Sequence, residues 1–269
     1  MKQTILIALL FTSITIQAQT VLKCTLLDSA TKAPVEYVNV GIPNKGVGTV
    51  SNEQGVFTLN IPDSLANETI KISAIGYASK TVRINQLKTI SKLYLATQSV
   101  GLKEVTIKPH TIKQTVLGNK TTAQAITITS AGKNLGWEIA TFLNIKHKQT
   151  YLKTVKISMV KNPYTNAKYR VNIYAKDAKG NIGENILKQP IIGTFPTTKT
   201  VIEIDLTKHN VYVDDDVYVA IEQISMYESG KNQITFSAKL MDKIYFRASS
   251  QGAWQNLPVG VGMWVDAEY

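Results

Sequence analysis

Alternating hydrophobic and polar residues run along the first third of the chain in short stretches separated by turn-forming residues. Leu22, Cys24 and Leu26 share one side of an expected strand, because successive side chains of a strand point to opposite faces. Further strands are expected at 35–40, 56–61, 68–75 and 80–84, with turns at 43–46 and 51–55. This spacing, without a helical stretch between the strands, predicts a β-sandwich over residues 20–97.

A second series of strands fills the C-terminal half of the chain. The period of two continues through 125–129, 136–145, 155–159, 169–175, 202–206, 217–222, 234–240, 243–248 and 262–267. About nine or ten short strands in roughly 150 residues predict a jelly-roll-like β-sandwich over 121–269. Residues 98–120, with Pro109 and one short strand, are expected to connect the two sandwiches. The predicted fold class is therefore all-β.

Three stretches of the first sandwich carry a family resemblance. They read Ala33-Pro34-Val35-Glu36-Tyr37-Val38-Asn39-Val40, Gly48-Thr49-Val50-Ser51-Asn52-Glu53-Gln54-Gly55-Val56-Phe57-Thr58-Leu59 and Ile75-Gly76-Tyr77. Together they closely resemble the carboxypeptidase regulatory-like domain, a transthyretin-like β-sandwich of exported Bacteroidota-type proteins. Residues 100–107 also resemble the short strand that often closes this domain. Ser51-Asn52 stands where the family more often has Thr-Asp, and Asn52 can make the same side-chain-to-backbone turn bond.

The motif residues are interpreted as structural rather than chemical. Gly55 permits a positive φ in a tight turn, and Gly48 lies in a second turn. Phe57 is expected to anchor the core. Gly76 allows a kink or a close backbone approach, and we expect the Tyr77 ring to lie over the edge of the sandwich.

The second sandwich resembles uncharacterised jelly-roll domains that follow the same module in exported proteins, and its topology is reminiscent of galactose-binding-like modules. The resemblance lies in residues 169–174, 183–187, 204–206 and 216–222. It implies an architecture and no catalytic role.

The N-terminus is typical of a secretory signal peptide over residues 1–19. One lysine precedes a short apolar run, and small or polar residues follow at 17–19; a buried strand or helix is the alternative. Lys23 directly before Cys24 argues against a lipoprotein signal. We expect an exported protein, in the periplasm, associated with the outer membrane or at the cell surface. No later segment is apolar enough to form a membrane-spanning helix.

Charge and cysteine content limit the choice of partners. The net charge is +11 and falls to about +10 without the signal peptide, and the 30 basic residues comprise 27 Lys and 3 Arg. Scattered lysines predict a solvated surface, or else attraction to an anionic envelope surface. Nucleic-acid binding is not expected, because such sites use clustered basic residues and arginine forks. Cys24 stands alone, so no internal disulfide can form.

The sequence lacks the usual catalytic motifs. A zinc peptidase of the related kind would need a His-x-x-Glu pair, but His110, His147 and His209 lack Glu at that spacing. No Gly-x-Ser-x-Gly elbow or phosphate-binding loop occurs. The carboxylates that alternate along the later strands, at Glu203, Asp205 and Glu222, are expected to face solvent rather than form a glycosidase pair. We therefore predict a protein that is not an enzyme and has no cofactor.

Asp214, Asp215 and Asp216 form the densest acidic run and are a weak calcium candidate. The spaced pattern of a dedicated calcium loop is missing, so a solvated turn before a strand is favoured and no metal is predicted.

Aromatic residues in polar loops are the best candidates for binding. Trp254 and Tyr164 lie in such loops, where exposed rings can stack on a sugar or anchor a protein partner. The alternative for Trp254 is that it folds back and caps the sandwich. Trp137 and Trp264 are expected in the core.

These observations predict a non-catalytic envelope protein that acts as a protein-interaction module or as an accessory subunit of an outer-membrane or periplasmic assembly. Its partner would be another envelope protein or an outer-membrane complex. The alternative is a carbohydrate-binding surface protein that uses the loop aromatics of the jelly roll, with a glycan as its ligand.

Overall fold

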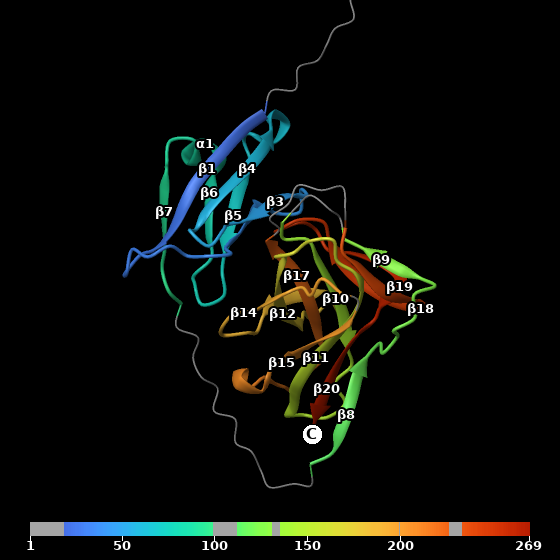
Figure 1. Ribbon diagram of the computed structural model, residues 1–269. Helices are drawn as coiled ribbons and strands as arrows, with labels where there is room; N and C mark the ends of the chain where they lie inside the picture. The colour runs from blue at the N-terminus through green and yellow to red at the C-terminus, as the bar shows by residue number, and fades with distance from the viewer. Residues whose placement is uncertain (1–18, 99–111, 131–134, 199, 226–232) are drawn as a thin grey trace, which may run out of the picture.

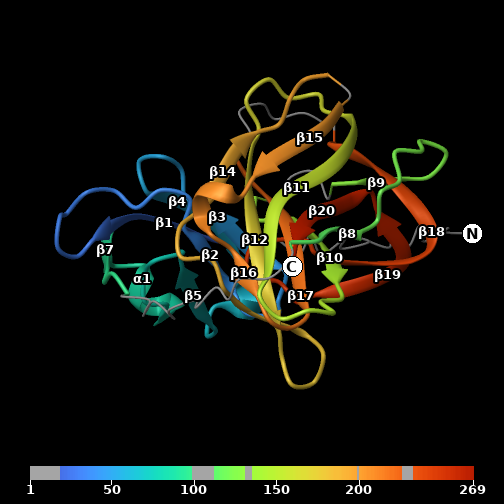
Figure 2. The same ribbon diagram turned by 90° about the horizontal axis from the view of Figure 1, so that it is seen from below.

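The structure is a computed structural model that describes residues 19–98, 112–130, 135–198, 200–225 and 233–269. The strands build two sandwich-like units that lie side by side (Figures 1 and 2), and the all-β fold class is confirmed. The expected signal peptide falls on residues 1–18 outside the described part, and so does the strand expected at 100–107.

Two small sheets form the first unit, a three-stranded sheet in the order β4-β1-β7 and a four-stranded sheet in the order β3-β2-β5-β6. Their bounds are β1 (Gln19–Asp28), β2 (Asn39–Ile42), β3 (Val47–Val50), β4 (Val56–Pro62), β5 (Thr69–Ser73), β6 (Lys80–Arg83) and β7 (Lys92–Leu95). A one-turn helix, α1 (Ile84–Leu87), and a 3-10 turn at Asp63–Leu65 complete the unit. Both sheets contribute to one hydrophobic core.

The predicted alternation of buried and more exposed residues along the strands of the first unit is confirmed. Leu22, Cys24 and Leu26 are all buried in this core, and burial raises the pKa of the Cys24 thiol. Phe57 is buried beside them, and Gly55 has a φ of 71°. The thiol therefore belongs to the packing of the sandwich.

The strand expected at 35–40 is wrong, because the chain turns at Glu36 and Tyr37 and β2 begins only at Asn39. The buried Ser51 hydroxyl replaces the missing ladder bonds. It accepts from the Val38 N–H at 2.9 Å and donates to the Val35 carbonyl at 3.3 Å. Asn52 makes the turn bond expected of it, accepting from the backbone N–H groups of Gln54 and Val56.

The second unit is built from a 13-stranded sheet. Its bounds are β8 (Gln114–Gly118), β9 (Thr127–Thr129), β10 (Glu138–Leu143), β11 (Thr150–Lys161), β12 (Lys168–Lys176), β13 (Ile182–Asn185), β14 (Ile191–Thr194), β15 (Thr200–Asp205), β16 (Tyr212–Val213), β17 (Val217–Ser225), β18 (Thr235–Arg247), β19 (Gln255–Val261) and β20 (Met263–Glu268). A 3-10 turn lies at Thr207–His209. Because β18 pairs with β10 and β19 and also with β9 and β11, it joins two halves of the sheet that share one core.

Two details of the second unit differ from the sequence-based expectation. The separate strands expected at 234–240 and 243–248 are the single strand β18, with an irregular register between Leu240 and Ile244 and a φ of 59° at Met241. In addition, β8 lies within the expected connector and pairs with β20. Among the described residues, no helix has the length and apolar character to cross a membrane.

The two sandwiches touch through closely approaching backbones. A Cβ placed on Gly48 would lie 1.9 Å from the Ser250 carbonyl oxygen, and one on Gly41 would lie 2.4 Å from it. Beside this contact, Gln251 Nε2 donates to Ser73 Oγ at 2.8 Å. Gly48, which the sequence places in a turn, lies in β3 and allows the second unit to approach.

Replacement of Gly48 by alanine should therefore weaken the contact between the two units. The new methyl group meets a backbone carbonyl rather than a flexible side chain, so the free energy of unfolding should fall by about 1–3 kcal/mol. Urea unfolding followed by circular dichroism measures this loss. The control is Gly46→Asn, since a Cβ there meets no atom within 4 Å and Asn tolerates the positive φ. Equal losses in the two variants would contradict the proposed close approach.

Candidate functional site

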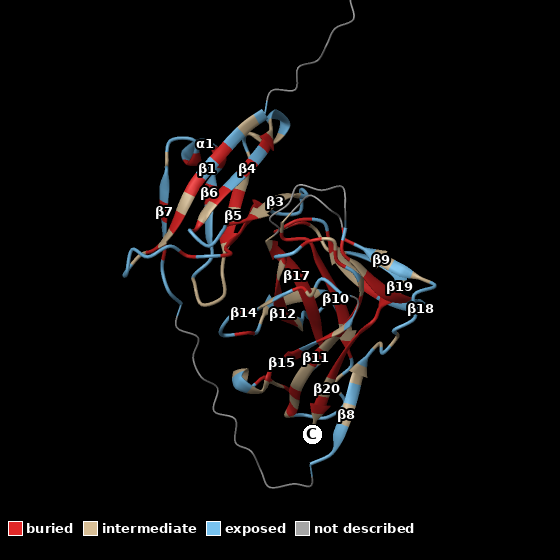
Figure 3. Cartoon of the chain, viewed as in Figure 1, coloured by how far each residue is buried: buried red, intermediate tan, exposed pale blue. Residues whose placement is uncertain are grey.

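A row of charged residues crosses the face of the second sandwich that meets the first. The register of β12, β17, β10 and β18 places four charged side chains opposite one another: Arg170, Glu222, Glu138 and Arg247. All four are buried, and Glu138 and Glu222 have 0% exposure. Strands β12 and β17 are accordingly buried along nearly their whole length (Figure 3). The expectation that Glu222 faces solvent is therefore wrong, because its carboxylate is buried and accepts hydrogen bonds from Arg170 and Asn172.

Hydrogen bonds hold the charged row together. Arg170 donates from Nε and Nη2 to Glu222 Oε2, at 3.0 and 2.7 Å. At the other end, Arg247 Nη2 lies 2.6 Å from Glu138 Oε2. Asn172 Nδ2 donates to both carboxylates, at 2.7 Å to Glu138 and 2.8 Å to Glu222. Each buried charge thus has an opposite charge beside it, as burial of an ion pair requires.

The charged row also bonds to the first sandwich. Arg170 Nη1 donates to the Tyr37 carbonyl at 2.7 Å, and Nη2 donates to Asn39 Oδ1 at 2.6 Å. Nearby, Lys168 Nζ lies 2.6 Å from Glu53 Oε1. Tyr37 has a φ of 53°, and its charge-assisted bond to Arg170 offsets the strain of that conformation. Arg170 therefore connects the two units.

The two buried carboxyl groups have different electrostatic surroundings. Burial raises the pKa of Glu138 and outweighs the attraction of Arg247. Glu222 is buried to the same degree, but Arg170 and Arg247 outweigh this desolvation and lower its pKa. Burial also raises the pKa of Tyr174, whose hydroxyl donates to Glu138 Oε1 at 2.9 Å. Neither carboxyl group is exposed, and each is paired with an arginine.

A polar cleft of about 390 Å³ opens beside the charged row, between the two sandwiches. The first sandwich contributes Tyr77 and Gln98 to its lining, and the second contributes Tyr174, Asn185, Arg247 and Trp254. Side chains of these types can donate and accept hydrogen bonds and can offer aromatic faces to a ligand.

Trp254 lies in this cleft and folds back on its neighbours. Its ring meets that of Tyr174 edge-on, with centroids 5.8 Å apart, and the Arg247 guanidinium carbon lies 5.0 Å from its centre. The ring is partly buried, in agreement with the alternative that Trp254 folds back onto the sandwich. Trp254 nevertheless lines the cleft. Trp137 and Trp264 are buried as expected.

Tyr164 is not exposed, which corrects the expectation drawn from its polar loop. Its exposure is 2%, and its ring belongs to the core of the second sandwich. The Asn162 side chain folds the loop inward, accepting from the Tyr164 N–H and donating to the Phe195 and Pro196 carbonyls. The structure therefore does not bring Tyr164 and Trp254 together in one site.

Bonds to the surrounding chain hold the acidic run at 214–216 in place. Asp214 Oδ1 accepts from the Gln149 N–H at 2.8 Å, and Asp216 accepts from the Ile145 N–H and pairs with Lys176. Within the described ranges, no group of three or more His, Cys, Asp and Glu side chains is arranged to hold a metal ion. The calcium candidate gains no support. The Asp214 and Asp216 carboxylates instead accept hydrogen bonds from backbone N–H groups of the segment between β10 and β11.

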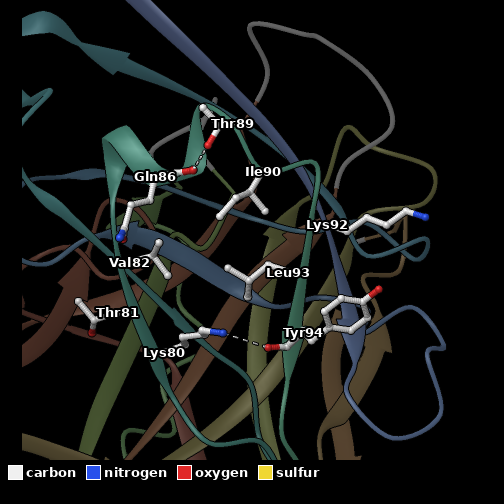
Figure 4. Close-up of a pocket in the computed structure, with 9 residues that line it drawn as sticks. All are labelled: Lys80, Thr81, Val82, Gln86, Thr89, Ile90, Lys92, Leu93 and Tyr94. Atoms are coloured by element: carbon white, nitrogen blue, oxygen red, sulfur yellow. Dashed lines mark hydrogen bonds between the residues drawn. The ribbon is translucent and has the colours of Figure 1, made fainter.

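A second hollow, of about 500 Å³, lies in the first sandwich between β6 and β7 (Figure 4). Its floor includes Val82 and Leu93, which also belong to the hydrophobic core, and Lys80 and Lys92 line it as well. Because β6 and β7 are edge strands of their respective sheets, the hollow lies at the open edge of the sandwich, between the two sheets.

Sequence reasoning missed the charged row, although one signal was present. The chain has 27 Lys but only three Arg, and two of these are Arg170 and Arg247. Arginine suits buried ion pairs better than lysine because its planar fork is pre-organised and less strongly hydrated. Rare arginines in a lysine-rich chain therefore indicated buried partners, but not which ones.

Replacement of Arg170 by methionine should strongly destabilise the protein. It would leave the Glu222 carboxylate buried without its ion pair and without the two hydrogen bonds from Arg170, at a cost of about 3–5 kcal/mol, measured by urea unfolding. The control is Lys156→Met, which removes a partly exposed lysine paired with Glu203 and Asp266 and should cost less than about 1 kcal/mol. The double variant Arg170→Met/Glu222→Leu should recover part of the loss. A single-variant loss no larger than that of Lys156→Met would contradict the assigned role.

Comparisons with known proteins find a family model that matches the first sandwich. No curated protein matches the chain. Among solved structures, a chain of infectious bursal disease virus, Gt strain, is similar at 11% identity with a TM-score of 0.34; the match covers 93% of this chain and 63% of that one. The VP2 subviral particle of the same virus is similar at 9% identity with a TM-score of 0.32; that match covers 93% of this chain and 64% of the other. This chain spans less than two thirds of both, and at these scores neither similarity carries an argument. Residues 22–107 match the model of the CarboxypepD_reg-like domain, in agreement with the resemblance that the motifs of the first sandwich carry.

Proposed function

We propose that the protein is an exported, non-catalytic envelope protein that acts as a protein-interaction module or as an accessory subunit of an outer-membrane or periplasmic assembly. Export is supported by the N-terminal residues, which have the layout of a signal peptide. The location would be the periplasm, the outer membrane or the cell surface.

The observation that carries the proposal is an apolar edge on the second sandwich, formed by Leu240, Met241 and Leu257. Met241 is 99% exposed, Leu240 55% and Leu257 48%. Leu240 pairs with Val259, two residues from Leu257, so the exposed side chains come from one hairpin. Large side chains gathered in this way on a folded surface mark a place where another protein binds.

The backbone of this edge supports the same role. In the part of the chain that the structure describes, β19 pairs only with β18, which leaves its other side with unpaired backbone groups. Pro258 lies within β19. Because proline has no backbone N–H, it limits the pairing of this edge with a further strand. In Figures 1 and 2, β18 and β19 lie on the side of the second sandwich away from the first, where a partner meets no obstruction from that domain.

The buried contact between the sandwiches supports a binding role as well. Arg170 bonds to the backbone and to a side chain of the first sandwich, which restrains the second unit relative to the first. An accessory subunit benefits from such restraint, because less conformational freedom is lost when a pre-organised surface binds.

Glycan binding is the second candidate function. The observation that favours it is the position of Trp254 in the polar cleft between the sandwiches, because aromatic faces beside hydrogen-bonding groups suit sugar rings.

The protein-binding role is tested by affinity capture of the tagged full-length protein from gently solubilised native envelopes, with quantitative mass spectrometry. A partner should be recovered with the wild type and should fall by about tenfold or more with Leu240→Ser/Met241→Ser, since loss of central apolar contacts costs more than about 1.4 kcal/mol.

The matched control is Ile192→Ser, a change at another exposed apolar side chain, on β14. Recovery of the same partner should stay close to the wild-type level in this variant. Absence of any stoichiometric partner, or equal recovery with the Leu240→Ser/Met241→Ser variant, would overturn the proposed role of the apolar edge.

A further inference from the structure

The cleft between the sandwiches contains a buried donor that the protein does not use. Arg247 lines the cleft and is 8% exposed, and its Nε–H has no hydrogen-bond partner among the described residues. A buried N–H without an acceptor is costly. The Arg247 side chain also lines the cleft, where its guanidinium can donate to an oxygen atom of a ligand.

The charges around the cleft balance, which favours a neutral ligand. Arg170 is paired with Glu222, and Arg247 lies against Glu138. The remaining charged side chains of the lining are Lys71 and Glu184, which have opposite signs. A phosphate or a multiply charged anion would find no net positive field here, whereas an uncharged polar molecule loses no favourable interaction.

Aromatic and amide side chains also line the cleft. Trp254 provides an indole face, and Tyr77 lies on the opposite domain. Gln98 and Asn185 add amide groups that can donate to and accept from hydroxyl groups. A volume of about 390 Å³ lies near the lower end of the range for small-molecule sites, which fits a monosaccharide or a disaccharide.

We infer that the cleft between the two sandwiches binds a neutral saccharide unit, with its apolar ring face against Trp254 and its hydroxyl groups bonded to the Arg247 guanidinium and to the amides of Gln98 and Asn185. This inference deepens the glycan-binding candidate and does not depend on the apolar edge. It assigns binding to residues of both domains, so an isolated domain lacks the complete site.

Saturation-transfer difference NMR on the full-length protein tests the site. The probes are glucose, galactose, mannose, N-acetylglucosamine and the acidic sugar glucuronate, each at millimolar concentration. At least one neutral sugar should give a signal, with its ring protons most strongly saturated. Trp254→Ala should weaken its binding by about tenfold, and Gln98→Ala, which changes an exposed amide of the other domain, should weaken it measurably.

Two further variants separate binding from folding. Trp254→Phe keeps an aromatic face, so it should retain the NMR signal while losing the change in tryptophan fluorescence on sugar addition. Tyr94→Ala removes an exposed aromatic ring from the hollow between β6 and β7 and should leave sugar binding unchanged. Thermal unfolding by circular dichroism establishes that each variant is folded.

Three results would overturn the inference. If no sugar gives a signal, both the cleft site and the glycan-binding candidate fail. If a sugar binds Trp254→Ala and Gln98→Ala as well as the wild type, glycan binding survives but its site lies elsewhere. Binding of glucuronate alone would contradict the neutral ligand. None of these results depends on the Leu240→Ser/Met241→Ser variant, so the protein-binding proposal is judged separately.

Discussion

Four charged side chains taken out of water at one face of a sheet are the constraint on which the rest of the structure depends. Removing Arg170, Glu222, Glu138 and Arg247 from solvent is costly unless each gains a charged partner and hydrogen bonds. The cross-strand register supplies the partners, and Asn172 bridges the two carboxylates that would otherwise only repel each other. The first sandwich supplies the remaining acceptors for Arg170. Arg170 therefore has all of these acceptors only when the two sandwiches are together.

This constraint explains several features that lie far apart in the sequence. Close approach of the domains needs glycine at Gly41 and Gly48, where the Ser250 carbonyl leaves no room for a Cβ. It also needs the chain to turn at Tyr37, whose carbonyl then accepts from Arg170. The cleft lies where the charged row reaches the edge of this contact, so binding groups from both domains face a common space.

Much of the fold could be predicted from the sequence because strands of period two and their turns are local signals. Leu22, Cys24 and Leu26 face the core as their alternation requires. Alternation identifies the two sides of a strand, but it does not say whether the second side is solvated or covered by another domain. Alternation therefore predicts a solvated Glu222, although its carboxylate is buried and bonded to Arg170.

The candidate site was predictable only in part for a similar reason. Local composition identifies Trp254 as a loop aromatic, but its partners Tyr174 and Arg247 come from strands β12 and β18 and are not predictable from the loop itself. Tyr164 lies in an equally polar loop, yet the Asn162 side chain turns it into the core through bonds to residues more than 30 positions away. Local composition does not reveal such long-range bonds.

The central claim is that the buried charged row joins the two sandwiches into one cooperative unit, and differential scanning calorimetry of the mature protein tests it most directly. The account predicts a single transition whose calorimetric and van't Hoff enthalpies agree. It also predicts that Arg170→Met splits this transition into two, because the domains then unfold independently. Two separate transitions in the wild-type protein would contradict the claim.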